Sequence, residues 1–320
     1  MKKKIGFLFV LVLLAFCGSI MVGKTFFSFD LWLALWQQTL TASQSLIFFD
    51  FRLPRAVLAL IAGSAFGFSG FLLQGVTRNE LADASILGIN NGAGLCVMLY
   101  LGFYAQGSQL LPLIGMIGGL LAALLVYAIA YKQRQLLSME RILLSGIAVN
   151  AGLASASLLL TVQLSKERYS FVTAWLSGTI WGTSWTQVLS LLPWFLILGL
   201  LAFMITPLIN LLGFGEEQAI SLGVPLNLLR TGLLFVAIGL AASSVGYTGN
   251  LSFIGLLAPH IAKRLIGKES RWALIAAGMI GAILVLVSDT VGRLLLQSGE
   301  IPAGIVIAPP PPPPPPPPHP

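Results

Sequence analysis

Long apolar segments recur along almost the whole chain, and they constrain its fold more than any other feature. Each is roughly 20 residues long, the length at which an α-helix crosses about 30 Å of hydrocarbon. Backbone exposed to lipid must satisfy its hydrogen bonds within its own segment, so the pattern predicts an all-α, polytopic integral membrane bundle. The segments lie at residues 5–22, 56–76, 86–104, 110–131, 142–162, 188–212, 228–247 and 272–288.

The composition agrees with a membrane protein. Hydrophobic residues make up 57% of the 320 residues and charged residues only 9%, which leaves too few polar side chains to cover a water-soluble globule of this size. A shorter apolar segment at 251–262 contains Pro259, so we expect a half-length helix packed among its neighbours rather than facing lipid. A final span is expected to begin at Ile301.

The chain ends in a run of prolines at 309–318, followed by His319 and Pro320. Proline cannot continue a helix, and a polyproline II segment would leave its carbonyl groups unpaired in lipid. We therefore predict a transmembrane domain at 1–308 and a tail at 309–320 that is either foreign or disordered. The last helix is expected to be truncated or replaced.

Basic residues indicate the orientation of the chain. With the N-terminus inside, most of the 18 lysines and arginines fall on the cytoplasmic side, as the positive-inside rule requires. The net charge of +7 is then a consequence of membrane topology and does not indicate a nucleic-acid partner. The few basic residues assigned to the outer face are Lys24, Arg52, Arg55, Lys166, Arg168 and Arg293.

Four motifs follow one another in a fixed order. Residues 52–93 contain an Arg-Leu-Pro-Arg start, a glycine-rich helix, the turn QGVTRNELA and the continuation LGINNGA. Residues 211–226 read LLGFGEEQAISLGVPL, residues 249–260 read GNLSFIGLLAPH, and residues 301–304 read IPAG. These motifs closely resemble the iron–siderophore, haem and cobalamin family of ABC importer permeases, the FecCD type. Glu80 departs from the family, which usually has proline there.

The resemblance implies a ten-helix permease in the bacterial cytoplasmic membrane. Its implied partners are a second permease subunit, identical or similar, two cytoplasmic ATPase subunits, and an external binding protein that delivers a ferric siderophore, haem or cobalamin. The chain contains no GxxxxGK[ST] phosphate loop, so we expect it not to be an enzyme, with ATP hydrolysis in a separate subunit. No cofactor or metal site is expected. The sequence leaves open which chelate is carried.

Three groups of site residues carry over from the resemblance. Arginines at the outer face are expected to meet acidic residues of the binding protein, although each could instead pair locally, as Arg293 could with Asp289. A loop on the inner side is expected to dock on the ATPase, and a helix rich in small and polar residues is expected to line the pathway. The residues are Arg52, Arg55 and Arg293 for docking; Gly213, Gly215, Glu216, Glu217, Ala219, Leu222 and Gly223 for coupling; and Ser145, Asn150, Ser155, Ser157 and Thr161 for the pathway.

Two other functions fit parts of the sequence. An ion-coupled secondary transporter would usually place ionisable groups near the bilayer midplane, whereas the acidic residues here fall in loops or at helix ends. The sequence Gly67-Phe68-Ser69-Gly70 fits the nucleophile pattern of rhomboid-type proteases. A serine nucleophile needs a histidine base within reach, and His260 is predicted at the far end of another helix. We therefore expect Ser69 to belong to a helix-packing face.

Overall fold

All regular secondary structure in the described part of the chain is helical. The computed structural model describes residues 2–23, 36–37, 39–103, 110–132, 138–213, 216–221, 223–267, 270–296 and 299–308. Within these residues, seven helices are long and apolar enough to cross a membrane: Lys2–Met21, Ala42–Thr77, Leu111–Ala130, Met139–Thr161, Trp185–Leu208, Leu226–Thr248 and Arg271–Leu295. The predicted all-α polytopic bundle is confirmed, whereas the arrangement of ten spans stays a prediction.

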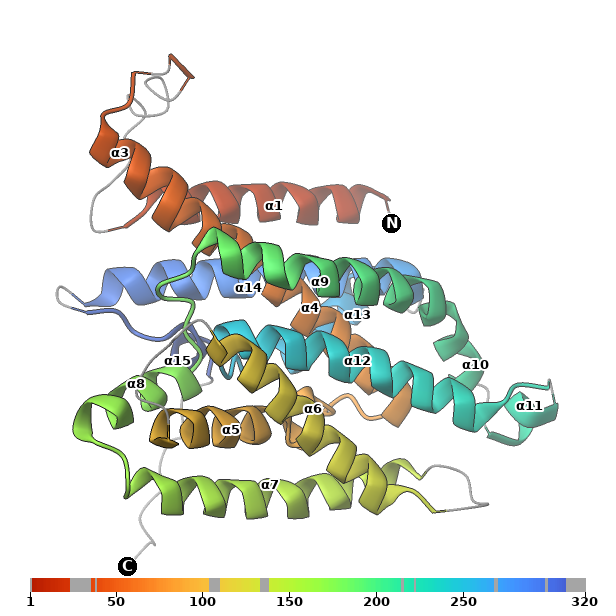
Figure 1. Cartoon of the computed structure of the whole chain (residues 1–320). Helices are drawn as coiled ribbons and strands as arrows, with labels where there is room; N and C mark the ends of the chain where they lie inside the picture. The colour runs from red at the N-terminus through yellow and green to blue at the C-terminus, as the bar shows by residue number, and fades with distance from the viewer. Residues whose placement is uncertain are drawn as a thin grey trace, which may run out of the picture.

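Most of the long helices lie side by side with their axes roughly aligned, whereas α4 and α6 run obliquely to them (Figure 1). The first half of the chain forms α1 (Lys2–Met21), α3 (Ala42–Leu46), η1 (Ile47–Arg52), α4 (Leu53–Thr77), η2 (Ala84–Leu87), α5 (Ile89–Phe103), α6 (Leu111–Ala130) and α7 (Met139–Thr161). The second half forms α8 (Lys166–Leu176), α9 (Trp185–Ile205), η4 (Thr206–Leu208), α10 (Ile209–Gly213), α11 (Glu216–Ser221), α12 (Leu226–Thr248), α13 (Ile254–Ile266), α14 (Ser270–Leu295) and α15 (Ala303–Ile307).

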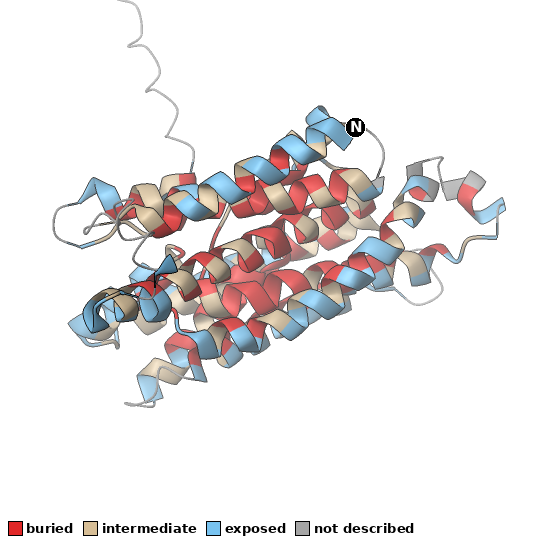
Figure 2. Cartoon of the chain, turned by 90° about the horizontal axis from the view of Figure 1, so that it is seen from above, coloured by how far each residue is buried: buried red, intermediate tan, exposed pale blue. Residues whose placement is uncertain are grey.

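Helix α4 occupies the centre of the bundle and packs against α9, α12, α13 and α14. Buried residues gather on these inner helices, whereas the outer helices turn exposed faces away from them (Figure 2). Small residues allow the close approach. A Cβ added at Gly63 or Gly67 would overlap backbone of α14, and one added at Gly70 would overlap Gly255 of α13. The expected small-residue packing face is therefore present.

Ser69 belongs to the same packing face. Its side chain is fully buried, and its hydroxyl donates to the carbonyl oxygen of Ala237 in α12 at 2.7 Å. A hydroxyl held in this way between two helices serves as an interhelical hydrogen bond, which agrees with the packing role expected from the sequence.

Two interruptions shape the bundle. The first lies just before α4, where η1 is a π-helix and the Leu53 N–H donates to the Phe48 carbonyl oxygen. Pro54, at the start of α4, has no amide hydrogen to donate to the preceding turn. A second break separates α12 from α13, where Gly249 and Phe253 both have positive φ, at 64° and 68°. The half-length helix expected around Pro259 is confirmed as α13, in which Pro259 is buried.

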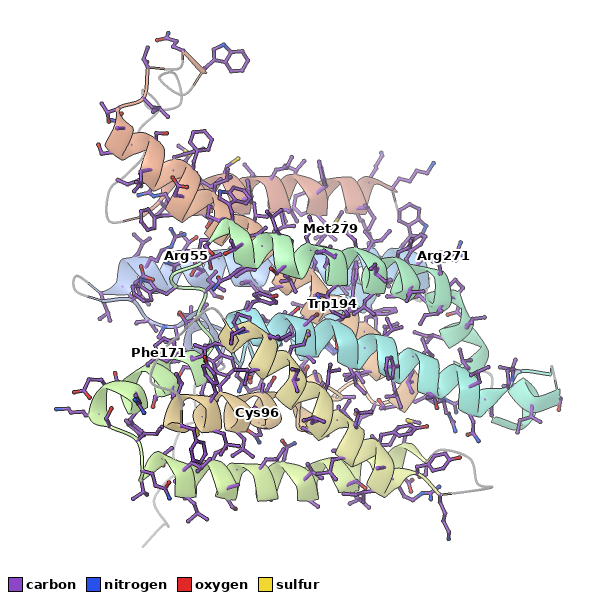
Figure 3. The ribbon with its side chains drawn as sticks, viewed as in Figure 1. Arg55, Cys96, Phe171, Trp194, Arg271 and Met279 are labelled. Atoms are coloured by element: carbon purple, nitrogen blue, oxygen red, sulfur yellow. The ribbon has the colours of Figure 1, made fainter. Side chains whose placement is uncertain are left out.

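Basic residues mark the two ends of the bundle. Arg271 lies at one end and Arg55 at the other (Figure 3). At the Arg271 end, Lys4 Nζ donates to the Leu265 carbonyl at the end of α13, at 2.7 Å. That end corresponds to the predicted cytoplasmic face and is called the inner end below. The Arg55 end is called the outer end.

The final span is short in the described residues. Helix α15 covers only Ala303–Ile307, two residues after the start that the sequence predicts, and it packs against α14. Gly304 sits against the carbonyl oxygen of Ser177, where a Cβ would overlap it. The predicted polyproline tail at 309–320 lies outside the described residues.

Candidate functional site

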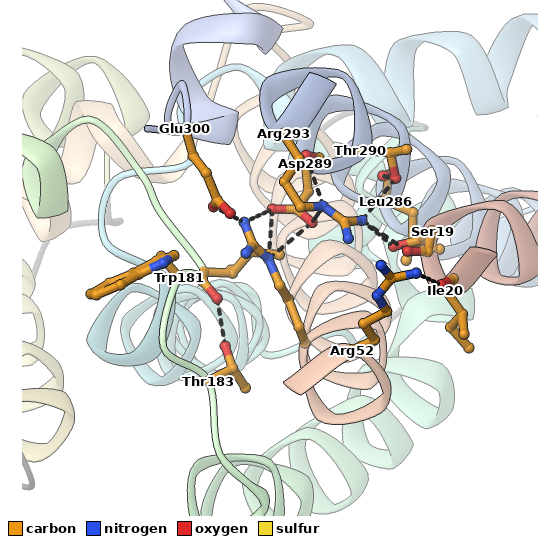
Figure 4. A network of polar contacts seen from close by, with 12 residues as sticks. Ser19, Ile20, Arg52, Trp181, Thr183, Leu286, Asp289, Thr290, Arg293 and Glu300 are labelled. Carbon is orange, nitrogen blue, oxygen red and sulfur yellow. Dashed lines mark hydrogen bonds and ion pairs between the residues drawn. The ribbon is translucent and has the colours of Figure 1, made fainter. Parts of the chain in front are cut away.

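Arg55 and Arg293 share the carboxylate of Asp289 at the outer end. Nη2 of Arg55 lies 2.7 Å from Asp289 Oδ1, and its Nε lies 3.1 Å from each carboxylate oxygen. Arg293 follows Asp289 by one turn of α14, and its Nε lies 3.2 Å from Oδ2. Glu300 adds a second carboxylate, 2.7 Å from Arg55 Nη2 (Figure 4). The local pairing considered from the sequence is therefore present.

Arg52 and Arg293 also meet the last turn of α1. Arg52 Nη1 donates to the carbonyl oxygens of Ile20 and Met21, at 2.7 and 3.2 Å, and Arg293 Nη2 donates to that of Ser19, at 2.9 Å. These carbonyls have no partner within their own helix and carry the negative end of its dipole. The three predicted docking arginines thus form one cluster, in which Arg52 of η1 and Arg293 of α14 bind the end of α1.

Burial limits how much of this cluster a partner can reach. Arg52 and Arg293 are only 8% and 7% exposed. They line a cavity of about 450 Å³ together with Arg55, Trp181 and other residues. The sequence did not reveal the role of Ser19, because it lies 274 positions from Arg293. Docking of a binding protein on these arginines stays a prediction.

A larger cavity of about 620 Å³ lies next to the one that the arginines line. Trp181 and Glu300 line both cavities. Phe171 and Trp175 of α8 line the larger cavity with Tyr247 of α12. Trp175 is 7% exposed, whereas Trp181, which lines both cavities, is 70% exposed.

The predicted coupling loop forms two short helices at the inner end. Gly213 ends α10, and Glu216 and Glu217 begin α11; Gly215 and Leu222 lie outside the described residues. Gly223 ends this turn with φ of 78°, and its N–H donates to the Ile220 carbonyl, a left-handed position that favours glycine.

The two apolar residues of α11 differ in their exposure. Ala219 is fully buried, whereas Ile220 is 51% exposed. Ala219 therefore packs within the chain, and Ile220 presents apolar surface outward; the coupling role of Ala219 stays a prediction. The reason for the difference in exposure is the direction of the helix: α11 turns Ala219 toward the bundle, and six residues carry too little periodic signal to predict that face.

Helix α7, which contains the predicted pathway residues, lies at the edge of the bundle against α5 and α6 (Figure 1). It exposes large apolar side chains, among them Leu144 at 68% and Leu159 at 72%. Ser155 is exposed on this helix and donates to the Ala151 carbonyl at 2.8 Å. Ser145, Ser157 and Thr161 are half-buried.

Asn150 is held by its own chain. Its Nδ2 donates to the carbonyl oxygens of Ser85 and Ile86 in η2, at 2.9 and 3.1 Å. Its Oδ1 accepts from Asn91 Nδ2 of α5 at 2.9 Å. The Asn150 amide therefore binds α5 through its oxygen and η2 through its nitrogen. The composition of α7 alone could not predict these partners.

The chain is similar to known permeases over nearly its whole length. It is 36% identical to the iron-uptake system permease protein FeuC of Bacillus subtilis over 96% of this chain and 94% of that protein. It is 39% identical to the iron(3+)-hydroxamate import system permease protein FhuG of the same organism, over 84% and 82% of the two chains. It is 33% identical to the hemin transport system permease protein HmuU of Yersinia pestis, over 95% and 91%.

A solved structure shares the fold. A structure described as a metal-chelate type ABC transporter in an inward-facing conformation aligns with a TM-score of 0.86 and 25% identity, covering 96% of this chain and 95% of that one. Residues 11–309 match the sequence profile of the FecCD transport family. The chain is accordingly a multi-pass membrane permease subunit rather than an enzyme, and it belongs to the FecCD transport family.

Proposed function

We propose that this chain is the membrane-spanning subunit of an ATP-driven importer that carries a ferric siderophore delivered by an external binding protein. The observation that supports this most is the near full-length similarity to a permease named for iron uptake. Haem and cobalamin are the other cargoes that the sequence left open, and one relative is named for hemin transport.

The arrangement of the helices suits such a complex. Helix α7 presents an exposed face at the edge of the bundle, where a second permease copy or a similar subunit would complete a pathway lined by Ser155 and its neighbours. Helices α10 and α11 stand at the inner end, where an ATPase would bind, and the arginine cluster stands at the outer end, where a binding protein would dock. Two ATPase subunits are expected for two permease subunits.

Uptake of a radiolabelled ferric siderophore into vesicles tests this function. The chain is reconstituted with its partner ATPase and binding protein, and uptake is compared among a ferric catecholate, a ferric hydroxamate, haem and cobalamin. We expect uptake to require ATP and to stop when the phosphate-loop lysine of the ATPase is replaced. Uptake that survives this replacement but collapses with the ion gradient would instead indicate an ion-coupled transporter.

A further inference from the structure

The segment between α4 and α5, residues 78–88, contacts both the predicted coupling helix α10 and the predicted pathway helix α7. We call it the 78–88 linker. Its first residue, Arg78, and its last, Gly88, both have positive φ, at 52° and 77°. These left-handed residues bound the linker on each side, and a left-handed backbone at a non-glycine residue such as Arg78 is uncommon.

The inner part of the linker contacts the coupling helices and α13. The guanidinium of Arg78 donates to the carbonyl oxygen of Leu212 in α10. Glu80 follows two residues later, and its Oε2 lies 3.4 Å from His260 Nδ1 in α13. A displacement of α10 would therefore act directly on the start of the linker, through a charged donor bound to a backbone acceptor.

The other part of the linker contacts the predicted pathway helix. Asn150 of α7 donates to two consecutive linker carbonyls, those of Ser85 and Ile86. Gly146, one turn earlier in α7, packs so closely that an added Cβ would overlap the Ile86 carbonyl oxygen. Both contacts involve linker backbone, so the linker cannot shift here without moving α7 or breaking the Asn150 hydrogen bonds.

The middle of the linker is compact. Residues Ala84–Leu87 form the 3₁₀-helix η2, and Ala82, Asp83, Ala84 and Leu87 are buried. The Asp83 carboxylate accepts from the Ser85 hydroxyl at 3.0 Å, and an added Cβ at Gly255 of α13 would overlap it. Packed segments of this kind move between discrete positions as units rather than deforming gradually.

We propose that the 78–88 linker transmits movement of α10 to α7, and that Asn150 is the positioning residue that fixes α7 to the linker. The proposal rests on the proposed function, because it needs an ATPase acting on α10 and α11. Asn150 then sets the position of the pathway helix relative to the coupling helices. It does so through the Ser85 and Ile86 carbonyls and needs no contact with the cargo.

The test measures ATP hydrolysis and chelate uptake in the same reconstituted complex. Asn150→Leu keeps a side chain of similar size but cannot donate, and Gly146→Ala pushes α7 away from Ile86. For both variants we expect assembly with the ATPase and binding-protein-stimulated hydrolysis within about twofold of the unmodified complex, whereas uptake per ATP hydrolysed falls about tenfold, within the range of typical coupling energies.

Asn91→Ala is the matched control. It also removes an asparagine hydrogen bond to Asn150, at the same place in the bundle, but leaves the donations to Ser85 and Ile86 in place. We expect its uptake per ATP to stay within about twofold. An equal loss in Asn91→Ala, or unchanged uptake per ATP in both test variants, would overturn the proposal. So would a parallel loss of hydrolysis and uptake in an assembled complex, because uptake per ATP would then be unchanged and Asn150 would act on hydrolysis rather than on coupling.

The unmodified complex separates the two hypotheses. If it shows no ATP-dependent uptake, the proposed function itself fails. If it transports normally and the Asn150→Leu and Gly146→Ala variants transport equally well per ATP, only the linker proposal fails. Should Asn150→Leu not assemble, Gly146→Ala provides the measurement, because its side chain adds a single methyl group.

Discussion

Arg52 and Arg293 donate to adjacent carbonyl oxygens of one helix end, those of Ile20 and Ser19 in α1, at 2.7 and 2.9 Å. Arginines from two other helices thus satisfy carbonyl groups that α1 cannot pair internally. The family resemblance assigns the same arginines to binding-protein docking, and basic residues are otherwise disfavoured at an outer membrane face. For Arg52 and Arg293, the hydrogen bonds to α1 give a structural reason for a basic residue at this face that requires no partner protein.

Replacing Arg293 is therefore expected to destabilise the fold. Arg293→Met removes the donor to Ser19 and one of the two guanidinium groups that flank Asp289, leaving buried acceptors without a partner. We expect a loss of about 2 to 4 kcal/mol in the free energy of unfolding, seen as a lower midpoint of thermal unfolding in detergent. Arg168→Met is the control, because Arg168 donates to Leu101 from a more exposed position. Equal small shifts in both variants would contradict this structural role.

Arg55 offers the clearest test of binding-protein docking. Its guanidinium already binds Asp289 and Glu300, and Arg55→Lys keeps the charge while losing the two-pronged geometry. If Arg55 also meets an acidic residue of the binding protein, docking should weaken about tenfold, whereas its dependence on salt should change little because the charge is kept. Binding is measured at low and high salt on variants whose unfolding midpoint is unchanged. Docking as tight as in the unmodified protein would remove Arg55 from the docking surface.

Gly70 of α4 lies directly against the backbone of α13. A Cβ there would overlap the backbone of Gly255, which no rotamer change can relieve. Gly70→Ala is expected to cost about 1 to 3 kcal/mol of stability by overpacking. Gly232→Ala in α12 meets nothing within 4 Å and should instead stabilise the helix by about 0.5 to 1 kcal/mol. Thermal unfolding of the two variants checks this difference in sign.

The sequence predicted those features that local periodicity carries. The lengths of the apolar segments predicted the membrane helices, and Pro259 predicted the half-length helix α13. The spacing of Gly63, Gly67 and Gly70 predicted the packing face of α4. The sequence did not predict the contacts of Asn150 or the arginines with distant backbone. Every residue has a backbone carbonyl group, so the sequence cannot indicate which carbonyl oxygen accepts a given side-chain hydrogen bond. Nor did it predict which way α11 faces, because six residues carry little periodic signal.

Ile220 is the exposed apolar residue of α11, and it is expected to contribute to ATPase binding. Ile220→Glu places a charge on this surface without disturbing the buried Ala219, so the chain should insert normally while co-purification with the ATPase is lost. Val162→Glu makes the same kind of change at the outer end, where Val162 is 84% exposed, and should leave ATPase binding intact. Retention of the ATPase by Ile220→Glu would show that this side chain lies outside the contact.

Asp83 in the 78–88 linker is expected to make stability depend on pH. Burial raises the pKa of its carboxyl group, while the N–H groups of Ala84 and Ser85 and the Ser85 hydroxyl oppose that rise. The folded state therefore holds the proton more tightly than the unfolded chain. Stability falls as pH rises from the unfolded pKa of about 3.9 to the raised folded pKa, and the loss persists above it.

Asp83→Asn removes this titration while keeping an oxygen that can accept from Ser85. At neutral pH we expect its midpoint of thermal unfolding to equal or exceed that of the unmodified protein, and the dependence on pH between about 4 and 7 to flatten. Asp50→Asn makes the same chemical change at an exposed position and is the control; its midpoint at neutral pH should stay close to that of the unmodified protein. A lower midpoint for Asp83→Asn at neutral pH would mean that the carboxylate's hydrogen bonds outweigh the cost of burying its charge.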